Sequence, residues 1–408
     1  MKFFLKTFGC RVNQVESQAI LEAFNKRGYT PAPFEQADIC LLNTCTVTHQ
    51  ADKDVEKLIR QILRRNPSAR LVLTGCYAAA HTEHIKQNFP QAEIIGKYEL
   101  GKKLFETEDL CWTVSGHEGH SRAFIKIQDG CDCFCSYCIV PFARSVKRSK
   151  PAAGVLQEIT ALVQKGFGEI VLTGINIGNY SCPQTGKDLA ALCEDIAKLP
   201  GHFRVRFSSI ELQTVTDGVI DAMAQYPARF CNYLHLPLQS GCDKVLKEMN
   251  RHYNTTQYAE KVADLRARVP GASVFADVIA GFPTETEEDF KTTYQFIESQ
   301  KLCGLHVFSY SPRPGTKAAA LPQLPFETIK ARAEKLRELD EKLRTDFAAS
   351  LVGSVQEVFI EEHSANGVRG VTGNFQQVIL ENAPADLHGL VHVKITDADG
   401  PLAFGQIL

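Results

Sequence analysis

Three cysteines within eight residues constrain the fold of this chain more than any other feature. Cys131, Cys135 and Cys138 have the spacing C-x3-C-x2-C, and they follow residues 124–127, an apolar run typical of a β-strand. Three thiolates on one short loop can hold three irons of a [4Fe-4S] cluster and leave the fourth iron without a protein ligand. A structural zinc site and a disulfide are the alternatives. Cys133 lies between two predicted ligands, and we interpret it as a bystander.

The loop DGCDCFCSYC resembles the cluster loop of the radical S-adenosylmethionine (radical SAM) superfamily. An iron without a protein ligand has an open coordination position, where a cofactor or substrate can bind and react. The resemblance implies that the amine and carboxylate of SAM chelate this iron. It also implies that Tyr137, the residue before the last cysteine, lies beside the adenine of SAM.

The composition is that of an ordinary globular protein. Of 408 residues, 44% are hydrophobic and 23% are charged, which suggests two or three domains. No apolar run is long enough to span a membrane, and the N-terminus turns polar too early for a secretory signal. We therefore expect a cytoplasmic protein whose 14 cysteines serve metal ligation more than disulfides. The formal net charge of −2 means that any nucleic-acid binding depends on local patches.

Residues 1–115 alternate between strand and helix patterns. Strands are predicted at residues 2–8, 37–43 and 70–74, and helices at 16–27 and 51–65. This order predicts a parallel α/β sheet, in which ligands gather beyond the carboxyl ends of the strands.

Cys10, Cys45 and Cys76 each follow one of these predicted strands. One sheet would bring the three thiols to the same edge, where we predict a second cluster. The alternative is that each is a small buried hydrophobic residue. Cys40, inside its strand, and Cys111 are interpreted as structural.

The segments TFGCRVNQVES, NTCTVT and TGCYAA resemble the methylthiotransferase branch of the radical SAM enzymes. With the core and tail described next, the resemblance covers essentially the whole chain. It implies that Cys10, Cys45 and Cys76 ligate an auxiliary [4Fe-4S] cluster. Within the branch, TFGCRVNQ is most similar to enzymes that act on N6-threonylcarbamoyladenosine at position 37 of tRNA.

Residues 118–325 repeat the strand and helix pattern. Strands are predicted at 124–127, 169–173, 203–207, 233–238, 273–280 and 306–310, with helices such as 243–249 and 256–268 between them. The expected fold is an open partial (β/α)6 barrel of the radical SAM type, with ligands bound where the strands end.

Polar and glycine residues concentrate in the loops after these strands. By resemblance, the residues that bind SAM are Tyr137, Thr173, Gly174, Asn176, Ser208, Glu211, Gln239 and Arg251. Arg251 matches a position that pairs with the methionine carboxylate, a task suited to a planar guanidinium. Asp277 is expected to face the barrel interior or the substrate. Taken singly, such residues are equally expected as helix caps or turn formers.

A basic run follows the cluster loop at Arg144, Lys147, Arg148 and Lys150. Two interpretations stay open, a solvated surface run and a phosphate-binding rim beside the active site.

Residues 326–349 have one apolar stripe at helical spacing and are predicted to form a linker helix. Residues 350–408 contain short strand patterns at 355–362, 376–381 and 390–398, which predict a small antiparallel β-barrel. This tail resembles the TRAM domain of tRNA-modifying enzymes. Residues 351–408 hold two basic residues against seven acidic ones, so RNA binding here would depend on shape and on aromatic residues such as Phe375.

The resemblance implies methylthiolation at C2 of an N6-modified adenosine in the tRNA anticodon loop. It implies two [4Fe-4S] clusters, two SAM-dependent steps, a low-potential electron donor and a sulfur source. The catalytic set is then Cys131, Cys135 and Cys138 with Cys10, Cys45 and Cys76. Three alternatives remain: an isopentenyladenosine tRNA substrate, a ribosomal-protein aspartate substrate, and a non-catalytic iron–sulfur electron carrier or RNA-binding scaffold.

Overall fold

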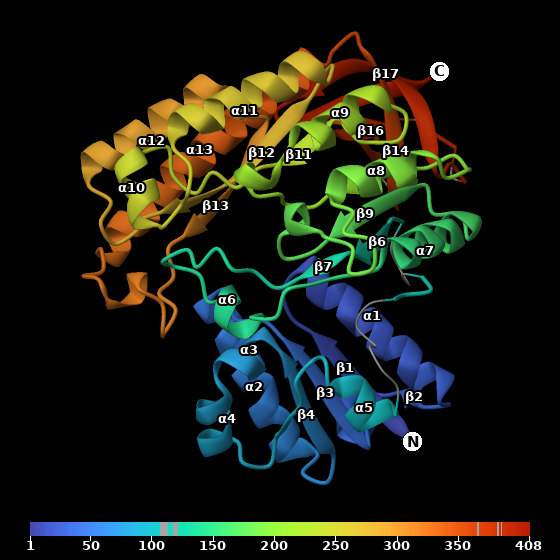
Figure 1. Ribbon diagram of the computed structural model, residues 1–408, viewed down its shortest axis with the longest axis vertical. Helices are drawn as coiled ribbons and strands as arrows, with labels where there is room; N and C mark the ends of the chain where they lie inside the picture. The colour runs from blue at the N-terminus through green and yellow to red at the C-terminus, as the bar shows by residue number, and fades with distance from the viewer. Residues whose placement is uncertain (107–112, 117–120, 365–366, 382, 385) are drawn as a thin grey trace.

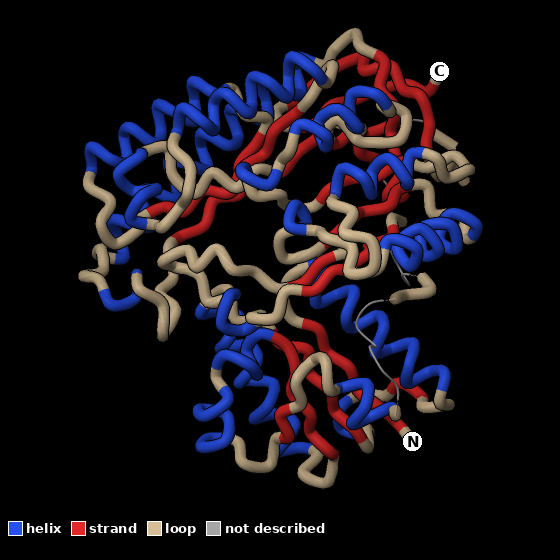
Figure 2. The backbone as a smooth tube through the Cα atoms, in the orientation of Figure 1, coloured by secondary structure: helices blue, strands red, loops and turns tan. Residues whose placement is uncertain are grey.

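The computed structural model describes residues 1–106, 113–116, 121–364, 367–381, 383–384 and 386–408. Cys111 lies outside these residues. An N-terminal sheet with its helices, a central set of parallel strands and a C-terminal β-barrel follow one another along the chain (Figure 1). Figure 2 shows helices on the outer side of the central strands. None of the described helices has the length and apolar character needed to cross a membrane.

The N-terminal part is a five-stranded parallel sheet in the order β2-β1-β3-β4-β5. Its strands are β1 (Lys2–Thr7), β2 (Thr30–Pro31), β3 (Ile39–Thr44), β4 (Arg70–Gly75) and β5 (Glu93–Ile94). Its helices are α1 (Arg11–Lys26), α2 (His49–Arg65), α3 (Cys76–Ala80), α4 (Thr82–Asn88) and α5 (Leu100–Phe105). The predicted parallel α/β sheet is confirmed, although α1 begins at Arg11, earlier than predicted.

Successive side chains of β3 point to opposite faces of the sheet, and both sets are apolar, which explains why helices cover both faces. Ile39 and Leu41 pack with residues of α1, whereas Cys40 and Leu42 pack with residues of α2. Cys40 is completely buried in this second core, which agrees with the structural role predicted for it.

The central part contains six parallel strands in two hydrogen-bonded groups, β10-β9-β6 and β11-β12-β13. A parallel bridge between Val205 and Phe230 connects the groups. The strands are β6 (Ala123–Lys126), β9 (Glu169–Thr173), β10 (Arg204–Phe207), β11 (Tyr233–His235), β12 (Ser273–Ala280) and β13 (Gly304–Ser309). The predicted open partial barrel is confirmed.

Helices and a small hairpin connect these strands. The helices are α6 (Val140–Ala143), α7 (Ala152–Gln164), α8 (Leu189–Ala197), α9 (Asp217–Gln225), α10 (Asp243–Glu248), α11 (Thr255–Arg268) and α12 (Glu287–Gln300). The hairpin pairs β7 (Gln128–Asp129) with β8 (Arg148–Ser149) and so brackets the cysteine loop. A further helix, α13 (Phe326–Ser350), buries Ala333, Leu336, Leu339 and Leu343 in the core of the barrel.

Side chains of β12 alternate between the barrel core and the barrel interior. Val274, Ala276, Val278 and Ala280 belong to the large hydrophobic core beneath the surrounding helices. The residues between them, among which are Phe275, Asp277 and Ile279, therefore face the interior of the barrel. This alternation decides which side chains can reach a bound ligand.

The C-terminal part is a closed barrel in the order β14-β15-β16-β18-β17. Its strands are β14 (Val355–Ser364), β15 (Gly367–Thr372), β16 (Gln377–Leu380), β17 (Leu390–Asp399) and β18 (Leu402–Ile407). The predicted small barrel is confirmed, with one refinement: β16 and β18 pair in parallel, and the other pairings are antiparallel.

The C-terminal barrel is attached to the central strands through Arg206. Its guanidinium donates to the backbone carbonyls of Thr372 (2.9 Å) and Gly373 (3.1 Å) and also pairs with buried Glu169. The same group lies 4.9 Å from the ring centroid of Phe375, and Phe375 packs against Tyr233 and Phe275. Phe375 thus packs at the junction of the two barrels while staying half-buried, and its RNA contact stays a prediction.

Candidate functional site

The cysteine loop is fixed onto the element that follows β11. Ser136 donates its backbone N–H to Met249 and its hydroxyl to the carbonyl of Glu248, at 2.9 Å and 2.8 Å. Arg251 donates to Sγ of Cys135 at 3.2 Å. The thiols of Cys131, Cys135 and Cys138 are close enough to interact electrostatically, and none of them is in a disulfide. The loop therefore brings the three predicted ligands together.

Burial makes a free thiolate costly in this loop. It raises the pKa of Cys138 to about 12 and also raises that of Cys135. A buried thiolate is stabilised by a bound cation such as iron. Hydrogen bonds from Cys133 lower the pKa of Cys131, and the assignment of Cys133 as a bystander to the cluster stays a prediction.

One group of predicted SAM residues lies beyond the carboxyl ends of β9 and β10. Two of these residues carry polar atoms without a hydrogen-bond partner among the described residues. The Asn176 amide nitrogen and the Ser208 hydroxyl are buried and make no hydrogen bond to any described residue. Thr173 ends β9, and a Cβ on Gly174 would lie 2.9 Å from the carbonyl oxygen of Gln128. This position therefore requires a residue without a side chain.

A second group of predicted SAM residues surrounds the cysteine loop. Arg251 forms an ion pair with Glu211, and both interact electrostatically with the phenol of Tyr137. Gln239 has a positive φ of 69° and donates its backbone N–H to the backbone carbonyl of Asp277 at 2.7 Å. The structure thus places these residues on the same side of the barrel as the three cysteines.

The N-terminal cysteines also meet, because parallel strands end at the same edge of a sheet. Cys10 caps α1, Cys45 follows β3, and Cys76 begins α3 directly after β4. The pKa of Cys45 is raised to about 11, mainly by burial and further by the nearby thiols of Cys76 and Cys10. Gly9 has a φ of +92°, and a Cβ there would lie 2.5 Å from Sγ of Cys45.

A buried ion network connects this second cysteine group to the barrel. Arg144 donates Nε to Sγ of Cys76 at 3.1 Å and Nη1 to Glu16 and Asp129, each at 2.8 Å. Its Nη2 donates to Oδ1 of Asn13 at 2.6 Å. Sequence analysis assigned no such role to Arg144, because its partners are distant along the chain.

The phosphate-rim interpretation of the basic run is wrong for two of its four members. Arg144 is held in the ion network, and Lys150 is buried and paired with Glu158. Lys147 and Arg148 are exposed and line a groove beside the cysteine loop. Lys147 pairs there with Asp132 at 2.5 Å.

A cavity lies between the two cysteine groups. Val47 and Thr48, which follow Cys45, line one side, and Tyr137, Cys138, Ile139 and Val140 line another. Gln239, Asp277, Ile279, Phe308, Ser309, Tyr310, Ser311 and Arg313 complete the lining. The cavity therefore borders the cysteine loop at Cys138, the segment that follows Cys45, and the barrel interior.

Two residues of this cavity were not identified from the sequence. Arg313 reaches across to the N-terminal part, donating to the Thr46 carbonyl at 2.9 Å and to Asp52 at 2.7 Å. Burial raises the pKa of the Tyr310 phenol, and a hydrogen bond from Gln323 partly offsets this. Both follow the last barrel strand, where a ligand-binding loop is expected.

Two family models match the chain. Residues 2–96 match "Uncharacterized protein family UPF0004", and residues 125–297 match "Radical SAM superfamily". The first match contains the N-terminal cysteines, and the second contains the cysteine loop.

Several characterised proteins are similar to this chain over nearly its full length. The threonylcarbamoyladenosine tRNA methylthiotransferase MtaB of Bacillus subtilis (strain 168) is 35% identical, over 98% of this chain and 95% of that protein. MtaB of Thermotoga maritima is also 35% identical, over 98% and 96%. The tRNA-2-methylthio-N(6)-dimethylallyladenosine synthase of Endomicrobium trichonymphae is 32% identical, over 100% of both chains.

Solved structures show the same fold at low sequence identity. The radical SAM methyltransferase TsrM from Kitasatospora setae has a TM-score of 0.57 at 14% identity, covering 78% of this chain and 77% of that chain. The cobalamin-dependent radical SAM enzyme OxsB has a TM-score of 0.53 at 12% identity, covering 84% and 56%. These likenesses concern the fold alone.

Proposed function

The chain belongs to the radical SAM tRNA methylthiotransferase family, and we propose that it methylthiolates C2 of N6-threonylcarbamoyladenosine at position 37 of tRNA. The observation that carries this proposal is the cavity between the two cysteine groups. Hydrogen removal and sulfur delivery act on the same carbon, so the substrate base must reach both groups from one cavity.

The residues of the structure fit the cofactors that this reaction needs. As a radical SAM enzyme, the chain uses SAM and a [4Fe-4S] cluster, for which Cys131, Cys135 and Cys138 are the ligands we propose. We propose a second [4Fe-4S] cluster on Cys10, Cys45 and Cys76, whose thiols are free and adjacent. When bound, the clusters and SAM supply the electron, the 5′-deoxyadenosyl radical and the methylated sulfur.

The side chains around the cysteine loop would bind and orient SAM. Arg251 suits a carboxylate, because its guanidinium offers two parallel donors. Its present partner, Glu211, is free to accept from the SAM amine or ribose once Arg251 has turned to SAM. The unsatisfied atoms of Asn176 and Ser208 gain partners in the same event.

The cavity has a mostly apolar lining that includes a few polar side chains. Gln239, Ser309 and Ser311 lie among apolar residues such as Ile279 and Phe308. The threonylcarbamoyl group carries urea, hydroxyl and carboxylate oxygens that can bond to these polar side chains. A dimethylallyl group has none and would leave them unpaired.

The substrate adenosine must leave its stack in the anticodon loop to enter this cavity. Lys147 and Arg148 line a neighbouring groove and would contact phosphates of that loop. A low-potential electron donor and a sulfur source complete the set of partners that we propose, and we place the reaction in the cytoplasm.

Mass spectrometry of tRNA nucleosides tests the proposal. The reconstituted protein is incubated anaerobically with SAM, reductant and sulfide, and with tRNA that carries either threonylcarbamoyl- or isopentenyladenosine. We expect a methylthio mass gain on the threonylcarbamoyl form alone. Gain on the isopentenyl form alone would replace the substrate while keeping the chemistry. Formation of 5′-deoxyadenosine with no gain on either tRNA would refute the tRNA substrate and favour a protein aspartate.

A further inference from the structure

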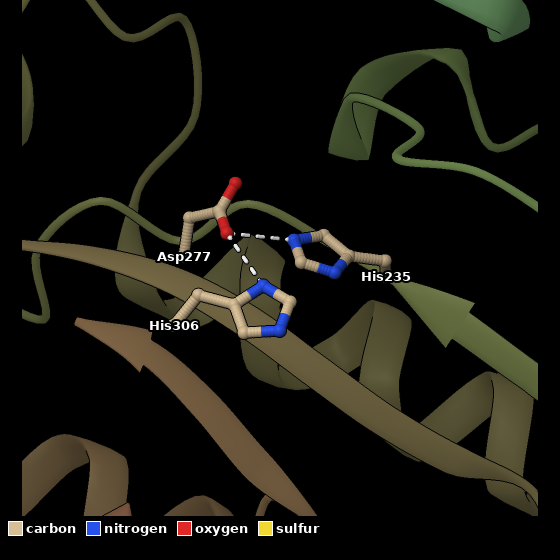
Figure 3. A group of neighbouring side chains, drawn as sticks. All are labelled: His235, Asp277 and His306. Atoms are coloured by element: carbon tan, nitrogen blue, oxygen red, sulfur yellow. Dashed lines mark hydrogen bonds and ion pairs between the residues drawn. The ribbon is translucent and has the colours of Figure 1, made fainter. Parts of the chain in front are cut away.

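Two histidines and an aspartate meet on three neighbouring strands of the barrel. His235 ends β11, Asp277 lies in β12, and His306 lies in β13 directly beside Asp277 in the strand register. Their nitrogen and oxygen atoms all lie within 4.8 Å of one another. Figure 3 shows both imidazole rings turned towards one oxygen of the Asp277 carboxylate.

Of the two contacts within this group, the longer has the separation expected for two ligands of one ion, and the shorter is slightly closer than that. Asp277 Oδ1 lies 2.8 Å from His235 Nε2 and 3.3 Å from His306 Nδ1. Donor atoms about 2.1 Å from one ion, at angles near 90–110°, are separated by about 3.0–3.4 Å. The second carboxylate oxygen points away from both rings (Figure 3).

The burial of His235 supplies a second reason to place a ligand here. The His235 side chain is buried, with an exposed fraction of 5%, and its Nε2 lies 2.8 Å from Asp277 Oδ1 in an ion pair. Two imidazoles therefore converge on one carboxylate oxygen, an arrangement of donor atoms that a cation could share.

We propose that His235, Asp277 and His306 bind a divalent transition-metal ion such as Zn²⁺ or Fe²⁺ inside the barrel. Two imidazoles and one carboxylate form a ligand set that suits these ions and leaves coordination positions open. Three neighbouring strands supply the three ligands, so the site is held by the rigid part of the fold.

The position of the site indicates what its open coordination positions receive. Asp277 also lines the cavity between the two cysteine groups, together with Gln239 and Tyr310. An ion on Asp277 would therefore lie at the inner wall of that cavity. The identity of the remaining ligand rests on the proposed function. The carboxylate or hydroxyl oxygen of the threonylcarbamoyl group occupies an open coordination position of the bound ion.

Cobalt binding to the cluster-loaded enzyme tests the site directly. Co²⁺ is titrated anaerobically into protein with both clusters assembled, and its d–d absorption is followed. We expect about one Co²⁺ per chain, competed by Zn²⁺ and without the intense charge-transfer bands of thiolate ligation. His235→Gln, Asp277→Asn and His306→Gln should each weaken binding more than about 100-fold. His392→Gln, the same change at an exposed histidine of β17, should leave binding unchanged.

Iron content and circular dichroism of each variant show that folding and clusters are intact. Co²⁺ that binds equally to wild type and the three variants, or no binding to intact wild type, would overturn the metal site. The substrate step has its own measurement: removal of the metal should raise KM for threonylcarbamoyl tRNA and leave SAM cleavage without tRNA unchanged. An unchanged KM with confirmed cobalt binding would overturn only that step.

Discussion

Glu16→Gln tests the buried network that connects the N-terminal sheet to the barrel. Burial alone would raise the pKa of the Glu16 carboxyl, but Arg144, Lys126 and Lys97 lower it from its ordinary value of 4.5 to about 2. Arg144 donates to both carboxylate oxygens, at 2.8 Å and 3.0 Å, and Lys126 donates at 2.6 Å. A glutamine of the same shape keeps the volume and removes the charge.

The pKa change sets the expected size of the effect. A carboxyl whose pKa falls from 4.5 to about 2 on folding contributes about 3 kcal/mol to stability at neutral pH. Loss of one partner from a buried ion pair costs a similar amount. Because the folded pKa is the lower one, this contribution is complete above the unfolded pKa and disappears as the pH falls through about 2. We expect Glu16→Gln to lose about 3 kcal/mol at pH 7 and clearly less near pH 3.5.

Urea unfolding of the cluster-free chain, followed by circular dichroism at both pH values, measures the difference. The matched control is Glu83→Gln, because the Glu83 side chain is 77% exposed and pairs only with Lys86 on the helix surface among the described residues. It should change stability by less than about 0.5 kcal/mol. A Glu16→Gln loss below about 1 kcal/mol at pH 7, or an equal loss at both pH values, would refute the reasoning.

Three further outcomes are expected. Replacing Cys10, Cys45 and Cys76 together by alanine should halve the iron bound, from about eight to about four per chain, while dithionite-driven SAM cleavage persists. Tyr310→Phe should cost less than about 1.5 kcal/mol in urea unfolding, because it removes a single hydrogen bond, the one with Gln323. Arg206→Met should remove two hydrogen bonds to the C-terminal barrel, cost at least about 2 kcal/mol and speed amide exchange in β15.

Much of the site was predictable because parallel strands impose their own geometry. Cys10, Cys45 and Cys76 are far apart in sequence, yet each follows a strand, and the ends of parallel strands coincide at one edge. The three ligands of the cysteine loop could be predicted from their spacing in the sequence alone. Arg144 could not be assigned in this way, because Glu16 lies 128 residues before it and only the packed structure joins them.

The barrel interior shows a second limit of sequence reasoning. The sequence predicts that Asp277 faces the interior or the substrate. For His235 and His306 it predicts only that they lie in strands. Strand alternation selects which residues point inward, whereas the register between strands decides which of them meet. The strands β15 and β18 were missed for a local reason, since glycines in GVRGVT and LAFGQI weaken the strand pattern.

The acidic composition of the C-terminal barrel has an internal explanation. Arg122 pairs with Glu361, and Arg204 lies 3.9 Å from Glu357, so arginines of the central barrel face acidic residues of β14. Part of the negative charge in residues 351–408 is thus paired with arginines of the central barrel, although Glu361 is exposed and Glu357 is half-buried. Net charge of the tail alone is therefore a poor guide to whether the assembled enzyme binds RNA. Under the proposed function, the surface charge available to RNA is that of Lys147 and Arg148, which line the groove beside the cysteine loop.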